Sequence, residues 1–379
     1  MHAEKPMTVA AAVALSTIGI FGILVAPIMT NILGATLQLD QAQIGQIIFA
    51  EIGGAALASI VATAWISKAN WRLVGVFAIV SVVVLNLLSG MQSDPMMLAV
   101  LRFLAGFLGQ GTAFAVAIGV INSSSNPDRI FGFSIATQVA ISVILLLVLP
   151  GLGAAYGVKG VLWPLAALAL VVLPLLLWIP TVSPKRAAAD MAAHTGSTML
   201  AVFALVVLLI WCTGIGAVWA FLLNIGEAGG LESTRAGQAM AISSGIAIVG
   251  ALTASALAGR GGRLLPVSVA VLVQVAAIML LQGEMSFIRF AATCAVFQTF
   301  WNFTGPYLMG MVAASDPTGR IAVLIPVAQT TGFGMGPAIA GGLMVTDSLS
   351  AANTVGVFGC LLALLLFVPV VIRASRPRG

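Results

Sequence analysis

Residues 198–225 read TMLAVFALVVLLIWCTGIGAVWAFLLNI, a stretch without a single Asp, Glu, Lys or Arg. At about 1.5 Å per residue, a helix of this length crosses the roughly 30 Å hydrocarbon core of a membrane. Similar stretches recur along the chain, in which 60% of the 379 residues are hydrophobic and 7% are charged. A soluble domain carries about 25% charged residues. The composition therefore excludes a water-soluble globule and predicts an all-α membrane protein, because a helix satisfies its backbone hydrogen bonds internally.

The apolar stretches, separated by polar, Gly or Pro clusters, predict twelve membrane-spanning helices. They cover residues 8–33, 44–67, 71–92, 96–123, 128–155, 158–180, 198–225, 236–258, 262–282, 286–314, 318–345 and 349–372. Of the 16 Lys and Arg residues, 12 fall on the side that both termini share. By the positive-inside rule we expect both termini in the cytoplasm, with the chain in the inner membrane of a bacterium.

Several other classes of protein are disfavoured by the composition. The basic residues sit in short connectors rather than on one soluble face, so we expect no nucleic-acid partner. The three cysteines, Cys212, Cys294 and Cys360, lie in apolar stretches without ligand-like spacing, which argues against a metal site or a disulfide framework. No phosphate-binding loop or catalytic Ser/His/Asp set is recognisable, so we expect neither an enzyme nor an ATP-driven pump, and no cofactor.

The two halves of the chain resemble each other at an offset of about 190 residues. Five pairs of short segments match in order: 31–32 with 224–225, 45–46 with 237–238, 68–72 with 260–263, 102–103 with 289–290, and 126–130 with 316–321. This repeat predicts an N-terminal six-helix bundle at 1–180, a polar cytoplasmic linker at 181–197 and a C-terminal six-helix bundle at 198–379.

Two glycine-rich segments suggest a family. Residues 102–106 (RFLAG) and 109–111 (GQG) lie in span 4, and Gly332, Gly336-Pro337 and Gly341-Gly342 lie in span 11. With the six-plus-six arrangement, they resemble motifs of the major facilitator superfamily of secondary transporters, closest in style to its drug and sugar proton antiporters. The resemblance implies transport by alternating access. The loop at 65–72 departs from the family pattern, because it keeps the basic residues and lacks the acidic one.

Glu51 is the acidic residue that lies well inside a predicted span, roughly 10 Å from its end at about 1.5 Å per residue. Burial of an ionised carboxylate in a membrane costs free energy unless the group is paired with a cation or contacts water. Burial favours the neutral form of a carboxyl group and a nearby Arg favours the ionised form, so such a group can load and release a proton. We therefore hypothesise that Glu51 couples transport to protons. The alternative is a structural Glu that pairs with Arg102.

Two arginines are the other charges within apolar segments. Arg102 lies at a depth in span 4 comparable with that of Glu51, so it is either the partner of Glu51 in proton coupling or the anchor of a substrate anion. Arg289 lies near the mouth of span 10, where it either contacts substrate or extends toward the lipid headgroups.

Further candidates are polar or aromatic residues in otherwise apolar helices. The predicted substrate-binding set, besides both arginines, is Gln110, Gln138, Ser243, Gln298, Trp301, Asn302, Tyr307 and Gln329. Aromatic faces with a few amides suit a partly apolar organic compound, although each ring also fits simple packing or lipid contact. Gating or packing roles are predicted for Lys68, Arg72, Gly332, Gly336 and Pro337.

Together these features predict a monomeric secondary transporter in the lipid bilayer. The leading hypothesis is proton-coupled export of a small, partly apolar organic compound, with the proton as the coupling ion. The alternative is uptake or facilitated transport of an organic anion, of carboxylate type, anchored by Arg102. A receptor or scaffold that transports nothing is disfavoured, because the chain offers no soluble domain through which to signal.

Overall fold

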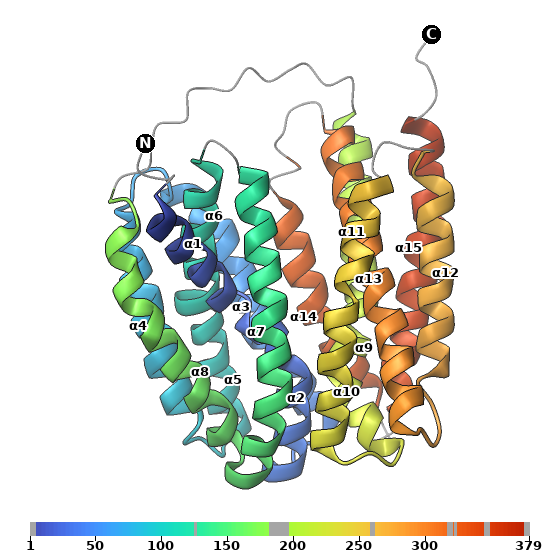
Figure 1. Ribbon diagram of the computed structural model, residues 1–379, viewed down its shortest axis with the longest axis horizontal. Coiled ribbons are helices and arrows are strands. Elements are labelled where there is room, and N and C mark those ends of the chain that lie inside the picture. The colour runs from blue at the N-terminus through green and yellow to red at the C-terminus, as the bar shows by residue number, and fades with distance from the viewer. Residues whose placement is uncertain are drawn as a thin grey trace. The chain divides into compact units, whose positions relative to one another are not determined.

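The computed structural model describes residues 5–124, 127–181, 197–257, 262–316, 321, 324–344 and 349–374. All regular elements in these ranges are helices (Figure 1). The chain divides into two compact units, Met1–Ala187 and Ala188–Gly379. Their boundary and most of the predicted linker fall within residues 182–196, outside the described residues.

The first unit contains six helical segments. Three segments are single α-helices, and a fourth is an α-helix that ends in a short 3₁₀ turn. The other two segments consist of two α-helices each. The elements are α1 (Pro6–Ile18), α2 (Phe21–Leu37), α3 (Gln41–Trp65), α4 (Trp71–Ser89), α5 (Pro95–Leu104), a π-helix η2 (Ala105–Gly111), α6 (Thr112–Asn122), α7 (Pro127–Tyr156), α8 (Val158–Val172) and a 3₁₀ turn η3 (Leu173–Trp178).

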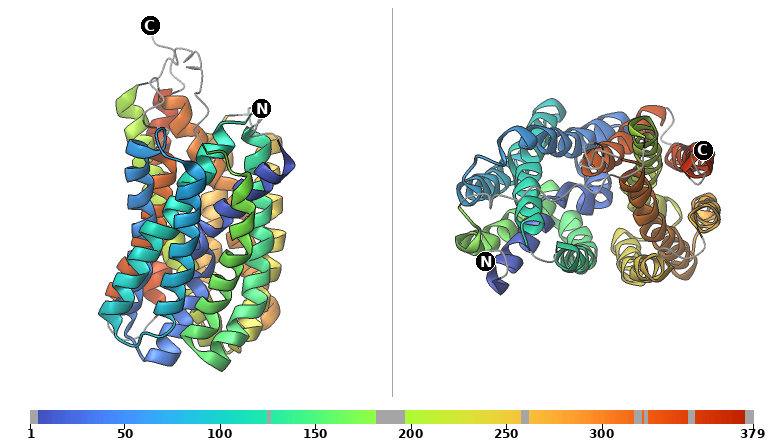
Figure 2. Two further views of the ribbon diagram at one scale, coloured as in Figure 1. Left: turned by 90° about the vertical axis from the view of Figure 1, so that its left-hand side faces the viewer. Right: turned by 90° about the horizontal axis from the view of Figure 1, so that it is seen from above.

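The second unit also contains six segments, and the right panel of Figure 2 shows the helices of each unit end-on. Its elements are α9 (Thr198–Ala228), α10 (Ser233–Ile246), α11 (Ile248–Leu257), α12 (Leu264–Leu280), α13 (Phe287–Ser315), α14 (Ile325–Leu343) and α15 (Ser350–Ala374). α10 and α11 form one segment that is interrupted at Ala247. α9 is the central helix, because α13, α14 and α15 all pack against it.

Nine of the described segments are long and apolar enough to span a membrane, and α12 is a shorter apolar helix of 17 residues. With α13 and α14 they make the twelve transmembrane helices that the sequence predicts. The predicted boundaries differ from the observed ones by a few residues. The stretch at 198–225, for example, is the core of α9, which continues to Ala228.

Local sequence fixes where the helices of the first unit begin. The Asp40 side chain accepts a hydrogen bond from the backbone N–H of Gln43, whose own side chain returns a bond to Asp40, and this capping box starts α3. The Asn70 side chain accepts from the backbone N–H of Leu73 at the start of α4, and the Asp94 side chain accepts from that of Met97 at the start of α5, where Pro95 follows it. These caps set the register of the three helices that carry the candidate site.

Glycines allow α3 to lie directly against the π-helix. A Cβ atom at Gly106 would overlap the backbone carbonyl of Glu51, and one at Gly111 would overlap that of Ala55. On the opposite helix, a Cβ at Gly54 would overlap the carbonyl of Phe103. Backbone contact of this kind is open to helices whose facing positions lack side chains. The glycines of the span-4 motif thus bring Glu51 close to the helix segment that carries Arg102.

In the second unit, the span-11 glycines lie against α9. A Cβ at Gly332 would come within 2.6 Å of the Cβ of Cys212, and one at Gly336 would overlap the backbone of Thr213 and Ala217. Pro337 is buried within the same helix. This part of α14 is therefore packed on α9 without intervening side chains.

Candidate functional site

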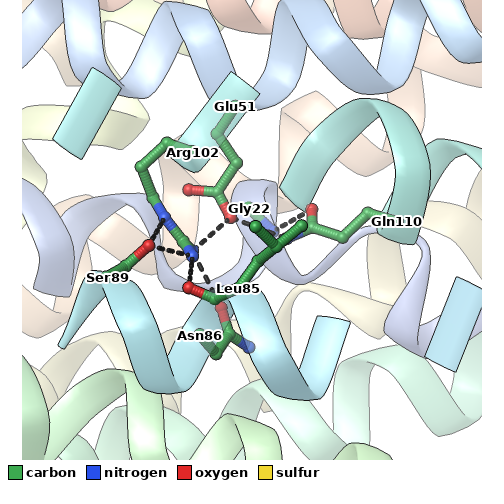
Figure 3. A network of polar contacts seen from close by, with 7 residues as sticks. All are labelled: Gly22, Glu51, Leu85, Asn86, Ser89, Arg102 and Gln110. Atoms are coloured by element: carbon green, nitrogen blue, oxygen red, sulfur yellow. Dashed lines mark hydrogen bonds and ion pairs between the residues drawn. The ribbon is translucent and has the colours of Figure 1, made fainter. Parts of the chain in front are cut away.

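The candidate site lies inside the first unit, where α3, α4 and α5 meet the π-helix (Figure 3). Glu51 is in the middle of α3, Arg102 is in the last turn of α5, and Gln110 is in the π-helix. All three side chains are buried: Arg102 is 0% exposed, Glu51 3% and Gln110 2%.

Arg102 uses all five of its N–H donors. Nε donates to Oγ of Ser89 over 3.1 Å, and Nη2 donates to the same oxygen over 2.7 Å and to the carbonyl of Leu85 over 3.0 Å. Nη1 donates to Oδ1 of Asn86 over 2.8 Å and to Oε1 of Glu51 over 3.4 Å. A guanidinium has five N–H groups, so none is left for another acceptor.

Glu51 is bound through one of its two carboxylate oxygens. Oε1 accepts from Nε2 of Gln110 over 2.6 Å, and from Arg102 as described. The amide oxygen of Gln110 accepts in turn from the backbone N–H of Gly22 over 3.0 Å, which ties the pair to α2. Oε2 of Glu51 has no hydrogen-bond partner among the described residues (Figure 3).

The electrostatics of the site depend on one ion pair. Arg102 and Glu51 form a salt bridge, with Nη1 3.4 Å from Oε1. Removing either charge from a buried pair leaves the other uncompensated, whereas a carboxylate can become neutral by taking up a proton and a guanidinium cannot. The acid is therefore the member of the pair that can change its charge.

The π-helix at Ala105–Gly111 interrupts the α-helical segment at the site itself. Short π-helices inside α-helices occur frequently at functional sites. This one carries Gln110 toward Glu51 and Gly106 against the Glu51 backbone. The corresponding segment of the second unit, α13, is one uninterrupted α-helix over Phe287–Ser315. The repeat seen in the sequence is therefore not reproduced in the backbone here.

The remaining predicted residues of the first unit lie outside this network. Gln138 is half-buried on α7 and donates to Oγ of Ser134 over 3.0 Å and of Ser16 over 3.4 Å. Lys68 is exposed between α3 and α4. Arg72 donates from Nε to the carbonyl of Ile179 over 3.1 Å, which links the start of α4 to the end of the sixth segment.

Arg289 occupies a different environment from its repeat partner Arg102. It is exposed in the first turn of α13, and its guanidinium donates to three backbone carbonyls at the end of α12 and in the following loop. Those carbonyls belong to Leu280, Gln282 and Glu284. A cation at a helix C-terminus is electrostatically favoured, so this arrangement stabilises the loop.

Two predicted polar residues of the second unit are buried between α10 and α13. Ser243, the repeat partner of Glu51, donates to the carbonyl of Ala239 or Ala291 over 2.7 or 2.8 Å. Gln298, the partner of Gln110, accepts from Oγ of Ser244 over 2.7 Å, and its Nε2 has no hydrogen-bond partner among the described residues.

An aromatic cluster lies where α9, α13 and α14 meet. The ring of Trp301 contacts those of Trp219, Phe297 and Phe333, with centroids 5.5, 6.2 and 5.3 Å away. Trp301 itself is half-buried. This group of rings is the largest aromatic contact set that the described residues show.

Other candidates on α13 and α14 are less constrained. Tyr307 packs on Phe303 at 5.2 Å, and its buried hydroxyl has no partner among the described residues. Asn302 makes one long bond of 3.4 Å to the carbonyl of Ala247. Gln329 is half-buried, and no hydrogen bond of its side chain is seen in the described ranges.

Asn86 and Ser89 were not recognised as candidates from the sequence, although they provide three of the five acceptor contacts of Arg102. The signal available was their spacing: two polar residues three positions apart lie on one face of a helix. The described residues contain no group of three or more His, Cys, Asp or Glu that could hold a metal.

Comparisons with known proteins agree with this architecture. A sequence model described as "Major Facilitator Superfamily" matches residues 7–341. The solved structure of the nucleoside transporter NupG matches with a TM-score of 0.72 and 14% identity, covering 98% of this chain and 99% of that one. A mutant of NupG matches with a TM-score of 0.74 and 14% identity over 98% and 100% of the chains.

A third solved structure is similar. It is a bacterial homologue of the human lysosomal transporter Spinster, in an inward-facing and occupied conformation, with a TM-score of 0.69 and 15% identity over 97% and 94% of the chains. At such identities the likeness shows the fold alone. No sequence among the curated proteins matches this chain.

Proposed function

The chain belongs to the major facilitator superfamily of transporters, and we propose that it exports a small, partly apolar organic compound in exchange for protons, by alternating access. We place it, with both termini cytoplasmic, in the inner membrane of a bacterium, as a monomer. The basic residues on the side of the termini support this orientation.

The observation that carries the proposal is the buried pair of Glu51 and Arg102. The carboxylate is 3% exposed, it contacts the guanidinium over 3.4 Å, and its Oε2 is free of hydrogen bonds from the described residues. Burial favours the neutral acid and the guanidinium favours the carboxylate. Oε2 is therefore the atom on which we propose that the proton is carried.

The proposed substrate class rests on the second unit. The rings around Trp301 offer apolar and quadrupolar surface, which suits a planar or partly apolar molecule. The buried Nε2 of Gln298 and hydroxyl of Tyr307 lack partners in the described part of the chain. The Thr304 hydroxyl on the same helix is also without a partner in the described residues. Buried polar groups are normally hydrogen-bonded, so these three donors favour a ligand that accepts hydrogen bonds.

The alternative, an organic anion anchored by Arg102, has less support. Anion recognition by Arg requires free N–H donors, and all five of this side chain are engaged within the first unit. Arg102 is also 0% exposed. The arrangement favours a fixed counter-ion of Glu51.

The experiment has two stages. Purified protein is first screened by thermal shift against drugs, sugars, amino acids and carboxylates at two pH values. The compound that binds is then followed in proteoliposomes with an imposed pH gradient. We expect gradient-driven accumulation by the wild type, and its loss in Glu51→Gln with exchange at equal pH retained.

The control variant is Glu284→Gln, which makes the same chemical change at an exposed loop residue. It should behave as the wild type in both assays. Gradient-driven accumulation by Glu51→Gln at the wild-type level would refute the proton-carrying role. Binding of carboxylates alone, lost in Arg102→Ala, would support the anion transporter instead.

A further inference from the structure

The last turn of α4 binds the Arg102 guanidinium. Leu85 contributes its backbone carbonyl, Asn86 its Oδ1 and Ser89 its Oγ, and these three residues accept four of the five hydrogen bonds (Figure 3). The helix ends at Ser89 and has no basic residue of its own in this turn. Its C-terminal end carries partial negative charge, which Arg102 of α5 compensates.

The contacts to α4 are also shorter than the contact to Glu51. The four bonds to α4 measure 2.7 to 3.1 Å, whereas Nη1 lies 3.4 Å from Oε1 of Glu51. Charge-assisted N–H···O bonds normally measure about 2.7–2.9 Å. The bonds to α4 therefore hold the guanidinium farther from the Glu51 carboxylate than a close ion pair requires.

From this geometry we propose that Ser89 and Asn86 are positioning residues, which fix Arg102 to the end of α4 and keep it from closing onto Glu51. The inference rests on the proposed role of Glu51 as the proton carrier. When Oε2 takes up a proton, the guanidinium keeps its four bonds to α4. Protonation weakens the contact between Arg102 and Glu51 of α3. The helix whose contacts change is therefore α3.

The neutral form of Glu51 is compatible with its other contacts. A proton on Oε2 leaves Oε1 as a carbonyl oxygen, which still accepts from Gln110. Gln110 remains bound to the backbone N–H of Gly22. Protonation thus removes the charge attraction and leaves the neutral hydrogen bonds in place.

Among the described elements that pack against α3, Arg102 is the one charged residue. The elements packed against α3 are α2, α5, α6 and the π-helix. Among them, α2, α6 and the π-helix contain no Asp, Glu, Lys, Arg or His, and α5 contains Arg102 alone. The polar side chains that contact Glu51 in the described part of the chain are thus Arg102 and Gln110.

The test is a pH titration of the infrared carbonyl band of protonated carboxyl groups, using purified protein in lipid. The spectrum of Glu51→Gln is subtracted from that of each protein that retains Glu51, so the band of this residue is isolated without any substrate. Ser89→Ala removes two bonds from Arg102. The freed guanidinium should close onto both oxygens of Glu51 and stabilise the carboxylate.

We expect the midpoint of the Glu51 band to fall by about one pH unit in Ser89→Ala, the low end of the effect of an adjacent Arg on a carboxyl group. Asn86→Ala should lower it in the same direction by less, since it removes one bond. This variant also deletes the Nδ2 of Asn86, which has no partner in the described residues.

Ser81→Ala is the matched control, because Ser81 lies on the same helix and bonds its own turn at Phe77. Its midpoint should equal that of the wild type. An unchanged or raised midpoint in both Ser89→Ala and Asn86→Ala would overturn the positioning role while leaving the proton carrier intact. Absence of any titrating Glu51 band in the wild type would overturn the proposed function itself.

Discussion

Replacement of Arg102 by Met is expected to be among the most destabilising single substitutions in the first unit. It removes five buried hydrogen bonds and leaves Glu51, at 3% exposure, with Gln110 as its remaining donor. Removing one partner of a buried ion pair costs about 3–5 kcal/mol. We expect a loss in this range, reduced where Glu51 takes up a proton.

The partner substitution Glu51→Gln should cost less, about 1–3 kcal/mol. An amide oxygen can still accept from Gln110 and Arg102, and the guanidinium keeps its four bonds to α4. Because the two residues are in contact, the costs should not add. The double variant should be more stable than the sum predicts by about 1–3 kcal/mol.

The assay is unfolding by SDS in mixed micelles, followed by circular dichroism for the wild type, both single variants and the double variant. Arg289→Met is the control, because it removes an Arg whose three bonds are to backbone carbonyls at an exposed site. It should cost below about 1.5 kcal/mol. An equal cost for Arg102→Met and Arg289→Met, or additive costs in the cycle, would refute the buried-pair account.

Three further substitutions test the packing and the substrate site. Gly106→Ala should destabilise the protein by about 1–3 kcal/mol and impair proton-driven transport, because its Cβ overlaps the Glu51 carbonyl. Gly132→Ala, which has open space around it, should be neutral. Thermal unfolding of both variants checks this prediction. Gly336→Ala should be similarly costly and Gly342→Ala neutral in the same measurement, since the first position touches the backbone of α9 and the second touches nothing within 4 Å. Tyr307→Phe should leave stability unchanged or raised and weaken substrate binding about tenfold in titration calorimetry; unchanged binding would remove its hydroxyl from the site.

The fold was predictable from the sequence because its signals are local and large. Uninterrupted apolar stretches such as 198–225 need no tertiary information to be assigned to the membrane. The comparable depths of Glu51 and Arg102 were also sufficient to predict that the two side chains could meet, and they do.

The rest of the site depends on interactions between helices that sequence spacing does not reveal. The π-helix at Ala105–Gly111 packs its glycines on α3, and the helical repeat of span 4 does not indicate it. The internal repeat aligned Arg102 with Arg289, yet one is in the last turn of α5 and buried, and the other is in the first turn of α13 and exposed. Position within the helix decides which acceptors each can reach.

The most direct test of the account is the proton flux that accompanies substrate movement. Proteoliposomes are loaded with a pH-sensitive dye and with the compound identified by the screen, and the outward gradient of that compound is the driving force. Wild-type protein should move protons in the direction opposite to the substrate. Glu51→Gln should exchange substrate without moving protons, and a proton flux in this variant equal to that of the wild type would contradict the assignment of Glu51 as the proton carrier.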